Sequence, residues 1–406
     1  MNERLSYKLI LRCELSEPLF DLRLPENVQH LRVASIDDAE RALIARNGDF
    51  EAVLLFADDD NPSSIRFLES LREKYPNVVR LFIAKSLRPN EFSRAYQTAH
   101  GVFLNKVSQH DLSKDLDRAF RLQQLLNHPQ FVKYASSLGE LPHIPSIVAD
   151  LDQVLHSDRV VLKDVSAVIQ QEPELLDKML MLVNSSFFGM TTQPVNNLKE
   201  LVSLIGFWPI RNLLVAAKLY EVMEQKSDWH GFGFEQLKQR SVLVSQLASE
   251  LCYTSNMDQT LQSQSRLAGV FLDIGMIVLA TFDAEKYHQV MIRAQELNQP
   301  LYVVEKMLLG ATHAQIGAFL LDRWGVAPEL VHAVLFHHTP NASGDVDFSV
   351  LTASHLADSL LPPLFNAMGI NMGGRLSRDY LNSLGVINRL PSWEMTAHDM
   401  ARLLRN

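Results

Sequence analysis

Residues Leu267–Leu279 spell LAGVFLDIGMIVL, a stretch that is almost wholly apolar and contains a single carboxylate, Asp273. Burying an ionised carboxylate is costly, so such a group is normally paired, hydrogen-bonded, neutral or bound to a metal ion. Gly269 and Gly275 flank it, and a glycine inside a helix costs roughly 1 kcal/mol relative to alanine unless close packing requires it. The stretch therefore predicts a buried central helix with one polar group to satisfy, either by a metal ion or by a structural hydrogen bond.

The composition around this stretch is typical of a globular protein in a reducing compartment. The chain has 406 residues, which suggests two or three domains of ordinary size. Its net charge of −9 argues against a general nucleic-acid-binding surface, which needs an excess of basic residues. The only two cysteines, Cys13 and Cys252, can form neither a disulfide framework nor a cysteine-based zinc site.

The sequence predicts neither export nor insertion into a membrane. The N-terminal residues MNERLSYK are not followed by the apolar core of a signal peptide. The longest apolar run, residues 267–282, is interrupted by Asp273 and falls short of the ~20 residues that a membrane helix needs. We therefore expect a cytoplasmic, soluble protein that binds neither membranes nor nucleic acids.

The first 126 residues alternate short apolar runs with amphipathic helical patterns. The expected strands are Lys8–Cys13, His30–Ala34, Ala52–Phe56, Val78–Ala84 and Val102–Leu104, and the expected helices are Ile36–Arg46, Ser64–Lys74, Asn90–His100 and Gln109–Leu126. Strands that alternate with helices imply a parallel, doubly wound sheet, in which functional sites form at the carboxyl ends of the strands.

From residue 134 or so the pattern becomes helical throughout. His128-Pro129 marks the boundary, because proline disfavours a helical conformation in the residue before it. Apolar residues then recur at helical spacing, as at Ile147, Leu151 and Val154. We expect an α/β domain followed by an all-α bundle.

The N-terminal region resembles the receiver domain of two-component response regulators. The resemblance rests on the order of strands and helices, on FEAVLL followed by an acidic loop and RFLESLREKYP, and on VFLNKVSQHDL. A receiver captures a phosphoryl group with an acid pair that binds magnesium, an aspartate nucleophile at the end of the third strand, a hydroxyl after the fourth strand and a lysine. The resemblance implies a five-stranded (βα)5 fold over residues 1–126.

At the positions that match this machinery, the chain departs from the family. Glu14 stands alone in place of the acid pair, Phe56 replaces the nucleophile, Ala84 replaces the hydroxyl residue, and Lys106 is retained. The acidic run that begins at Asp58 is either a displaced acid site or a solvated turn. We therefore expect a degenerate receiver-like domain that does not take phosphate in the usual way.

The helical region resembles the HDOD domain, a non-standard relative of HD-type metal phosphohydrolases found in bacterial signalling proteins. The resemblance covers roughly residues 134–340 and rests on LPHIPSIVADL, QQEPELLDKMLMLVNSSFFG, LVSLIGFWPIRNLL, LAGVFLDIG and THAQIGAFLLDRWGVAPELVHAVLFHH, in that order. It implies a receiver-like domain over residues 1–126, an HDOD domain over 127–340 and a helical extension over 341–406 that packs on the bundle.

HD phosphohydrolases hold one or two divalent metal ions, and the resemblance implies where their ligands would lie in this chain. The first histidine would fall near Arg240 and the His-Asp pair is here Leu272-Asp273, so both histidines are missing. Adjacent helical residues project about 100° apart, so we expect only one of an adjacent histidine pair to face a single metal ion. The vestigial candidates are Asp273, His313, His337, His338 and Asp358.

Arg240 suggests an alternative to a metal ion. An arginine can satisfy a carboxylate with two hydrogen bonds, so we expect Arg240 to pair with Asp273 and His313 to be a core histidine. On this interpretation no residue is catalytic and no cofactor is bound. The alternative is a divalent ion such as iron, manganese or zinc in the HD-like site.

The degenerate motif favours a non-enzymatic regulator or scaffold linked to two-component or cyclic di-GMP signalling. The partners implied by the resemblance are signalling proteins of the histidine kinase, diguanylate cyclase or phosphodiesterase class, with homodimerisation as a further expectation. Two alternatives remain open. One is a metal-dependent HD-type phosphohydrolase acting on a nucleotide, and the other is a module that binds a nucleotide or cyclic dinucleotide.

Overall fold

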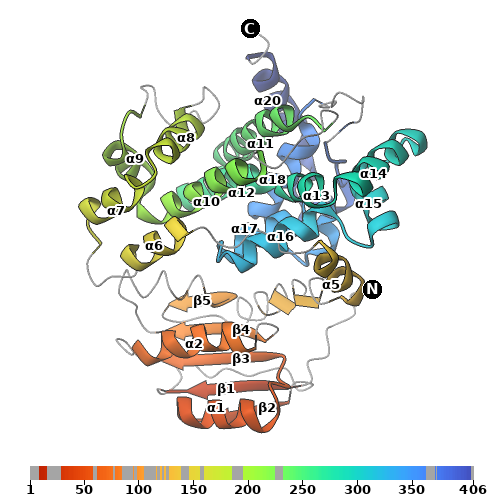
Figure 1. Cartoon of the computed structure of the whole chain (residues 1–406). Helices are drawn as coiled ribbons and strands as arrows, with labels where there is room; N and C mark the ends of the chain where they lie inside the picture. Colours follow the sequence, from red (N-terminus) through yellow and green to blue (C-terminus); the bar gives the residue numbers. More distant parts are fainter. Residues whose placement is uncertain are drawn as a thin grey trace. The chain divides into compact units, whose positions relative to one another are not determined.

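The apolar runs of the N-terminal region form a five-stranded sheet (Figure 1). Its strands are β1 (Ile10–Glu14), β2 (His30–Val33), β3 (Ala52–Ala57), β4 (Val79–Ala84) and β5 (Gly101–Leu104). They pair in the order β2-β1-β3-β4-β5, and every pair is parallel. The expected parallel sheet is therefore confirmed, with strand bounds within two residues of those predicted.

Both faces of this sheet are buried. Alternate residues of β3 enter different apolar clusters, with Val53 and Leu55 on one face and Leu54 and Phe56 on the other. This explains why the strands are nearly continuous apolar runs. Helices α1 (Ile36–Ala45) and α2 (Pro62–Lys74) follow β2 and β3 as expected, whereas the expected helices Asn90–His100 and Gln109–Leu126 fall largely outside the described residues.

The computed structural model describes residues 9–15, 29–57, 62–75, 78–84, 95, 98–104, 116, 119–120, 123–124, 128–138, 146–155, 160–184, 195–224, 232–362, 371 and 373–403. The chain divides into two compact units, with the main boundary after Asn127. The described elements of the second unit are all helical apart from isolated turns and a single bridge residue. An α/β unit thus precedes an all-α unit.

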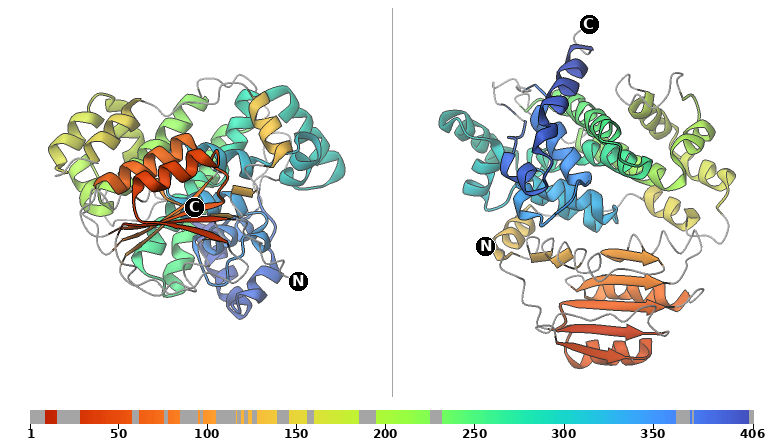
Figure 2. Two further views of the ribbon diagram at one scale, coloured as in Figure 1. Left: turned by 90° about the horizontal axis from the view of Figure 1, so that it is seen from below. Right: turned by 180° about the vertical axis from the view of Figure 1, so that it is seen from behind.

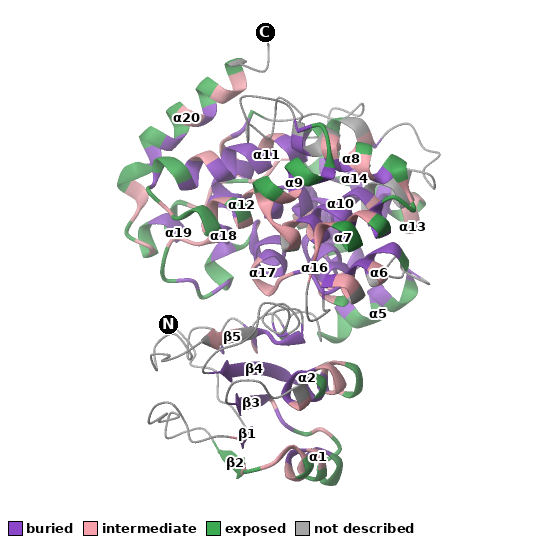
Figure 3. Cartoon of the chain, turned by 90° about the vertical axis from the view of Figure 1, so that its left-hand side faces the viewer, coloured by how far each residue is buried: buried purple, intermediate pink, exposed green. Residues whose placement is uncertain are grey.

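The bundle helices that precede the apolar stretch Leu267–Leu279 are α5 (Pro129–Ser137), α6 (Ser146–Leu155), α7 (Leu162–Ile169), α8 (Pro173–Asn184), α9 (Leu198–Ile205), α10 (Phe207–Glu224) and α11 (Phe234–Thr254). Those after it are α14 (Ala284–Leu297), α15 (Leu301–Leu309), α16 (His313–Arg323), α17 (Pro328–Phe336), α18 (Val350–Leu360), α19 (Arg378–Ser383) and α20 (Leu390–Leu403). Figure 3 shows the buried residues along strand β4 and along the inner helices.

The apolar stretch Leu267–Leu279 belongs to two helices rather than one. Helix α12 (Gln259–Phe271) ends just before Leu272, and α13 (Ile274–Phe282) begins just after Asp273. Asp273 itself has the non-helical angles φ −103° and ψ 13°. The expected single helix over Leu267–Leu279 was therefore wrong, and the break lies at the buried carboxylate.

The two flanking glycines let helices approach one another closely. A Cβ at Gly269 would overlap the Ser245 backbone of α11, and a Cβ at Gly275 would overlap the carbonyl of His313 at the start of α16. Both glycines are therefore required by close packing, as the sequence suggested. They hold α12 against α11 and α13 against α16, the two helix pairs around Asp273.

Helices α12 and α13 also have the length and hydropathy of a membrane-spanning segment. Taken together as Gln259–Phe282 they are the one stretch that passes this test in the described part of the chain, and 78% of its most apolar window is buried inside the protein. Such burial is typical of a core helix, which passes the same test of length and composition.

The C-terminal helices pack on the bundle. Trp393 of α20 is buried and donates from Nε1 to Ser255 Oγ at the end of α11, 3.1 Å away. The hydroxyl groups of Tyr380 in α19 and Thr352 in α18 are 2.9 Å apart. Helices α11 and α20 are neighbours, green and dark blue in Figure 2, so residues beyond 340 extend the same core.

We predict that Gly275→Ala destabilises the protein by about 1–3 kcal/mol, the usual cost of overpacking a filled core. The added methyl group would force α13 away from the carbonyl of His313. Urea unfolding followed by circular dichroism measures the change. Gln289→Ala, at an exposed position of α14, is the control and should shift the free energy of unfolding by less than about 0.5 kcal/mol; equal shifts for the two variants would contradict the packing role.

Candidate metal centre

Four buried side chains converge beside the break between α12 and α13. Asp273 comes from the break itself, His313 from the first residue of α16, and His337 and His338 from the turn after α17. One potential ligand atom from each lies within 4.8 Å of the others. Asp273 Oδ1 is 3.6 Å from His313 Nε2 and 3.7 Å from His337 Nε2, and the Nε2 atoms of His313 and His338 are 3.0 Å apart.

The local sequence explains why these side chains meet. Thr312 caps α16 in a capping box with Gln315, which fixes His313 at the start of that helix. Pro328 begins α17, and the helix ends at Phe336. Because His337 and His338 lie in the turn beyond it, both rings enter the cluster, with centroids 3.8 Å apart. The expectation that helical geometry would admit only one of them was wrong.

Hydrogen bonds on the outer side of two rings set the protonation of their inner nitrogens. His313 Nδ1 lies 2.8 Å from Glu305 Oε2, and His337 Nδ1 lies 2.7 Å from the carbonyl oxygen of Val334. A carboxylate and a carbonyl oxygen only accept, so each Nδ1 carries the proton. In the neutral imidazoles the lone pairs are then on Nε2, which faces the cluster.

Several polar atoms at the cluster are buried without a hydrogen bond in the described part of the chain. They are both carboxylate oxygens of Asp273, Nε2 of His337, Nδ1 of His338 and Oδ2 of Asp358. Buried polar groups are nearly always hydrogen-bonded. Unsatisfied atoms that face one another across 3.6–3.7 Å therefore leave room for a shared ligand.

Charges around the cluster favour an ionised aspartate. Burial opposes ionisation of Asp273, but His337, His313 and Arg240 together hold its pKa below the ordinary value. Burial and the neighbouring histidines keep the pKa of His338 well below its usual range, so this ring is neutral. Burial lowers the pKa of His313, but Glu305 and Asp273 outweigh that effect and raise it.

Arg240 lies next to the cluster but does not pair with Asp273. Its Nη2 is 2.7 Å from Asp358 Oδ1 and 2.6 Å from the carbonyl oxygen of Asp358, and both side chains are buried. The expected Arg240–Asp273 pair was therefore wrong. Asp358 in turn approaches His338, with 3.7 Å between its Oδ2 and His338 Nδ1.

The helical part of the chain matches a known domain family over residues 141–340. The chain contains an HDOD domain. A curated protein of Treponema pallidum, named only as uncharacterized, is 26% identical over 208 residues, which cover 50% of this chain and 39% of that relative. The crystal structure of an HDOD domain protein of unknown function from Geobacter sulfurreducens shares the fold, with a TM-score of 0.52 at 19% identity over 70% of this chain and 94% of that chain.

The HDOD match does not include every residue of the centre. Asp358 lies on α18, beyond residue 340, so the extension supplies the acid that neutralises Arg240. His355, one turn earlier on α18, donates from Nδ1 to the carbonyl oxygen of His337 at 2.7 Å and accepts at Nε2 from the backbone N–H of Ser377. The extension therefore braces the histidine turn of the HDOD domain.

Sequence reasoning missed Glu305. Its carboxylate accepts from the backbone N–H of His313 at 2.7 Å and from the hydroxyl of Tyr287 at 2.8 Å. A signal was available, because Glu305 stands midway between Leu301 and Leu309, at the spacing of one buried helical face. An acid within such a face predicts a buried polar partner.

In the N-terminal sheet, the expected phosphoacceptor positions are only partly described. Glu14 is buried and forms ion pairs with both Arg12 and Arg32. Phe56 lies beside it in register, and Ala84 ends β4 beside Ala57. Asp58 and Lys106 lie outside the described residues.

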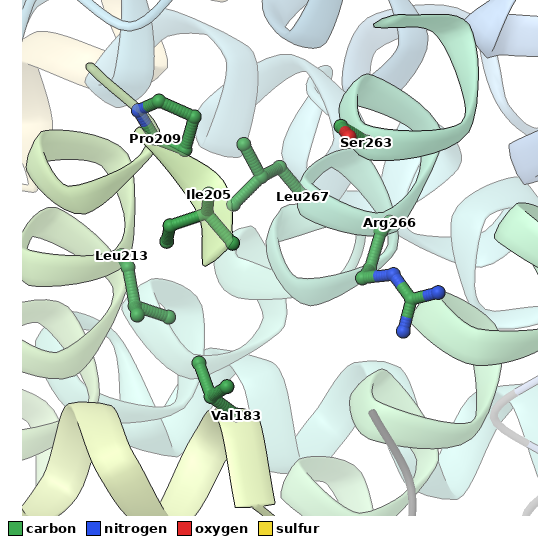
Figure 4. A pocket seen from close by; sticks show the side chains of 7 residues that line it. All are labelled: Val183, Ile205, Pro209, Leu213, Ser263, Arg266 and Leu267. Carbon is green, nitrogen blue, oxygen red and sulfur yellow. The ribbon is translucent and has the colours of Figure 1, made fainter. Parts of the chain in front are cut away.

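A small cavity lies elsewhere in the bundle (Figure 4). Its volume is about 20 Å³, room for roughly one water molecule. Its walls are mainly apolar, and Arg266 and Ser263 are at its edge. The lining residues are Val183, Ile205, Pro209, Leu213, Ser263, Arg266 and Leu267. It contains none of the clustered aspartate and histidine side chains.

We predict that Arg240→Ala destabilises the protein by about 3–5 kcal/mol, because it leaves the buried Asp358 carboxylate without its counter-ion. Urea unfolding in the presence of a chelator measures this change without a contribution from metal binding. The matched control is Arg240→Ala combined with Asp358→Ala. If the pair is the reason, the double variant loses clearly less than the sum of the single variants; strict additivity would contradict the pairing.

Proposed function

We propose that this chain is a signalling regulator that acts by binding other proteins and does not hydrolyse phosphate esters. The observation that carries this proposal is the enclosure of the centre. The side chains of Asp273, His313, His337 and His338 are 1%, 0%, 0% and 4% exposed. Catalytic metal centres keep a coordination position open to water and substrate, whereas structural centres are closed by protein ligands.

The position of Arg240 supports the same proposal. Its guanidinium is fixed on Asp358, at one side of the histidines. A fixed positive charge there opposes a second metal ion and occupies the carboxylate that such an ion would need. The two-metal arrangement that clamps both the attacking and the leaving oxygen of a phosphate ester therefore has no room.

The second candidate function is that of a metal-dependent phosphohydrolase. It is favoured by the convergence of one carboxylate and three imidazoles, a donor set that suits hydrolytic metal ions. It would require an opening through which a phosphate ester reaches the ion.

Exposed apolar side chains on one helical hairpin support protein binding. Helices α14 and α15 lie side by side, and together they carry a large share of the exposed large apolar residues of the described chain. Met307 is 56% exposed and Leu308 49%. Clustered apolar exposure marks interaction sites, whereas scattered residues do not. The hairpin residues of this kind are Ile292, Leu297, Val303, Met307 and Leu308.

For the N-terminal unit we infer a receiver-like domain that does not capture phosphate. The sheet order β2-β1-β3-β4-β5 is that of flavodoxin-like folds, in which receivers are built. The pairing of Glu14 with two arginines removes the acid that would bind magnesium. The partners that fit such a regulator are cytoplasmic signalling proteins of the histidine kinase, diguanylate cyclase or phosphodiesterase class.

We predict no phosphatase activity from the full chain. The purified protein, supplied with Fe²⁺, Mn²⁺ or Zn²⁺, should hydrolyse nucleotides, cyclic dinucleotides and bis(p-nitrophenyl) phosphate no faster than its Asp273→Ala variant, because no ester reaches the enclosed centre. Phosphate or p-nitrophenol release measures the rate. Metal-dependent turnover that Asp273→Ala abolishes would establish the phosphohydrolase instead.

We predict that Met307→Asp with Leu308→Asp abolishes partner binding, because two charges replace two exposed apolar side chains of the hairpin. The measurement is chemical cross-linking in the native cell, followed by mass spectrometry of the captured protein. Met395→Asp on α20, where Met395 is 63% exposed, is the matched control and should retain capture. The proposal fails if no signalling protein cross-links to wild type, or if the hairpin variant captures it equally well.

A further inference from the structure

We propose that residues 373–377 form a strap that closes the aspartate–histidine cluster over His338, and that release of this strap opens the cluster to small solutes. The strap belongs to the C-terminal extension, beyond the HDOD match at residues 141–340. This inference rests on the proposed function, which depends on the enclosure of the centre, and it names the element that controls that enclosure.

The backbone of the strap lies directly against the cluster. A Cβ at Gly374 would be 2.1 Å from Asp358 Oδ2 and 3.2 Å from His338 Nδ1. A Cβ at Gly373 would be 2.6 Å from Arg240 Nη2. Neither glycine has a positive φ, so the close approach, and not a backbone angle, requires glycine at these two positions. The strap therefore fills the space over His338 that a solute would otherwise enter.

Helix α15 covers His338 from another side. The ring of Tyr302 stacks on that of His338, with centroids 4.3 Å apart and planes inclined by 15°. Burial raises the pKa of Tyr302, and Arg375 of the strap is near enough to oppose this rise. The strap thus passes near Tyr302, so that the bundle covers a face of His338 and the extension covers its Nδ1 edge.

Few contacts hold the strap in place. The backbone N–H of Ser377 donates to His355 Nε2 at 3.0 Å, and Asn341 Nδ2 donates to Ser377 Oγ at 2.9 Å. All five strap residues are partly or fully exposed, whereas the neighbouring α18 is buried from Val350 to Asp358. Segments with few buried contacts open locally at a lower free energy than packed helices. The strap is therefore the part of the enclosure that opens most readily.

Closure also leaves two polar atoms beneath the strap without hydrogen bonds. His338 Nδ1 and Asp358 Oδ2 are buried, lack a hydrogen-bond partner among the described residues, and lie 3.7 Å apart. A buried polar atom without a partner costs free energy. Release of the strap would let water reach both atoms, and their hydration would offset part of the cost of opening.

The test measures the reactivity of histidines in the full chain, with a chelator present so that no adventitious ion shields the rings. Diethyl pyrocarbonate modifies accessible neutral imidazoles, and mass spectrometry locates each modified histidine. In wild type, His338 should react far more slowly than His398, whose side chain is 69% exposed. Gly374→Ala forces the strap away from Asp358 and should raise the rate at His338 about tenfold, because the open state becomes more populated.

The controls separate release of the strap from unfolding. Asn382→Ala, at an exposed position of α19 in the same extension, should leave His338 as slow as in wild type. His332 is buried in α17 and lies outside the cluster, so it should stay unmodified in every folded variant. Gly373→Ala, which displaces the strap from Arg240, is an independent second variant. Hydrogen exchange of the amides of residues 373–377 shows whether the strap is released.

A measurement on wild type keeps the test decisive if neither glycine variant folds. Urea well below the unfolding midpoint populates local openings before the whole domain unfolds. His338 should therefore become reactive at a lower urea concentration than His332.

The inference is overturned if His338 stays slow when hydrogen exchange shows the strap released, or if His338 and His332 become reactive together in urea. Other elements would then enclose the centre, and the regulatory function would stand. Rapid modification of His338 in wild type would overturn the strap and remove the enclosure that supports that function. Metal-dependent hydrolysis of a phosphate ester by wild type would overturn the regulatory function and leave the strap to be judged by the reactivity of His338.

Discussion

The need to satisfy one buried carboxylate shapes the core of this protein. Asp273 lies where α12 ends and α13 begins, and the break turns its side chain toward His313 and His337 rather than along an apolar helix. Gly269 and Gly275 allow the two half-helices to pack backbone-to-backbone against α11 and α16. The glycines, the helix break and the position of His313 are thus consequences of a single constraint, because an uncompensated charge in this core would cost more than any one contact provides.

The acids around the centre are satisfied by different groups. Asp358 pairs with Arg240, Glu305 holds His313 and receives the hydroxyl of Tyr287, and Asp273 faces the histidines. His313 lies against both Glu305 and Asp273, whereas the guanidinium of Arg240 pairs with Asp358. This division also explains why α18 matters to the HDOD domain although it lies outside residues 141–340: it carries the only acid that Arg240 contacts among the described residues.

Sequence reasoning succeeded where a local pattern determines the outcome. Apolar runs bounded by turns located all five strands, and glycines inside an apolar helix indicated close packing around Asp273. It failed where the outcome depends on how segments meet in space. The partner of Arg240 could not be known without the position of α18, and the joint use of His337 and His338 depends on α17 ending one residue before them. Glu305 was missed although an acid on a buried helical face signals a polar partner.

Helix α15 connects the centre with the surface. One side carries Glu305, which is fully buried and orients His313, and the opposite side carries the exposed Val303 and Met307. The two sides of a helix are about 10 Å apart, so a partner that binds the exposed side lies one helix diameter from the group that orients His313. A helix moves as a rigid element, so a displacement that alters the exposed side also alters the Glu305–His313 contact.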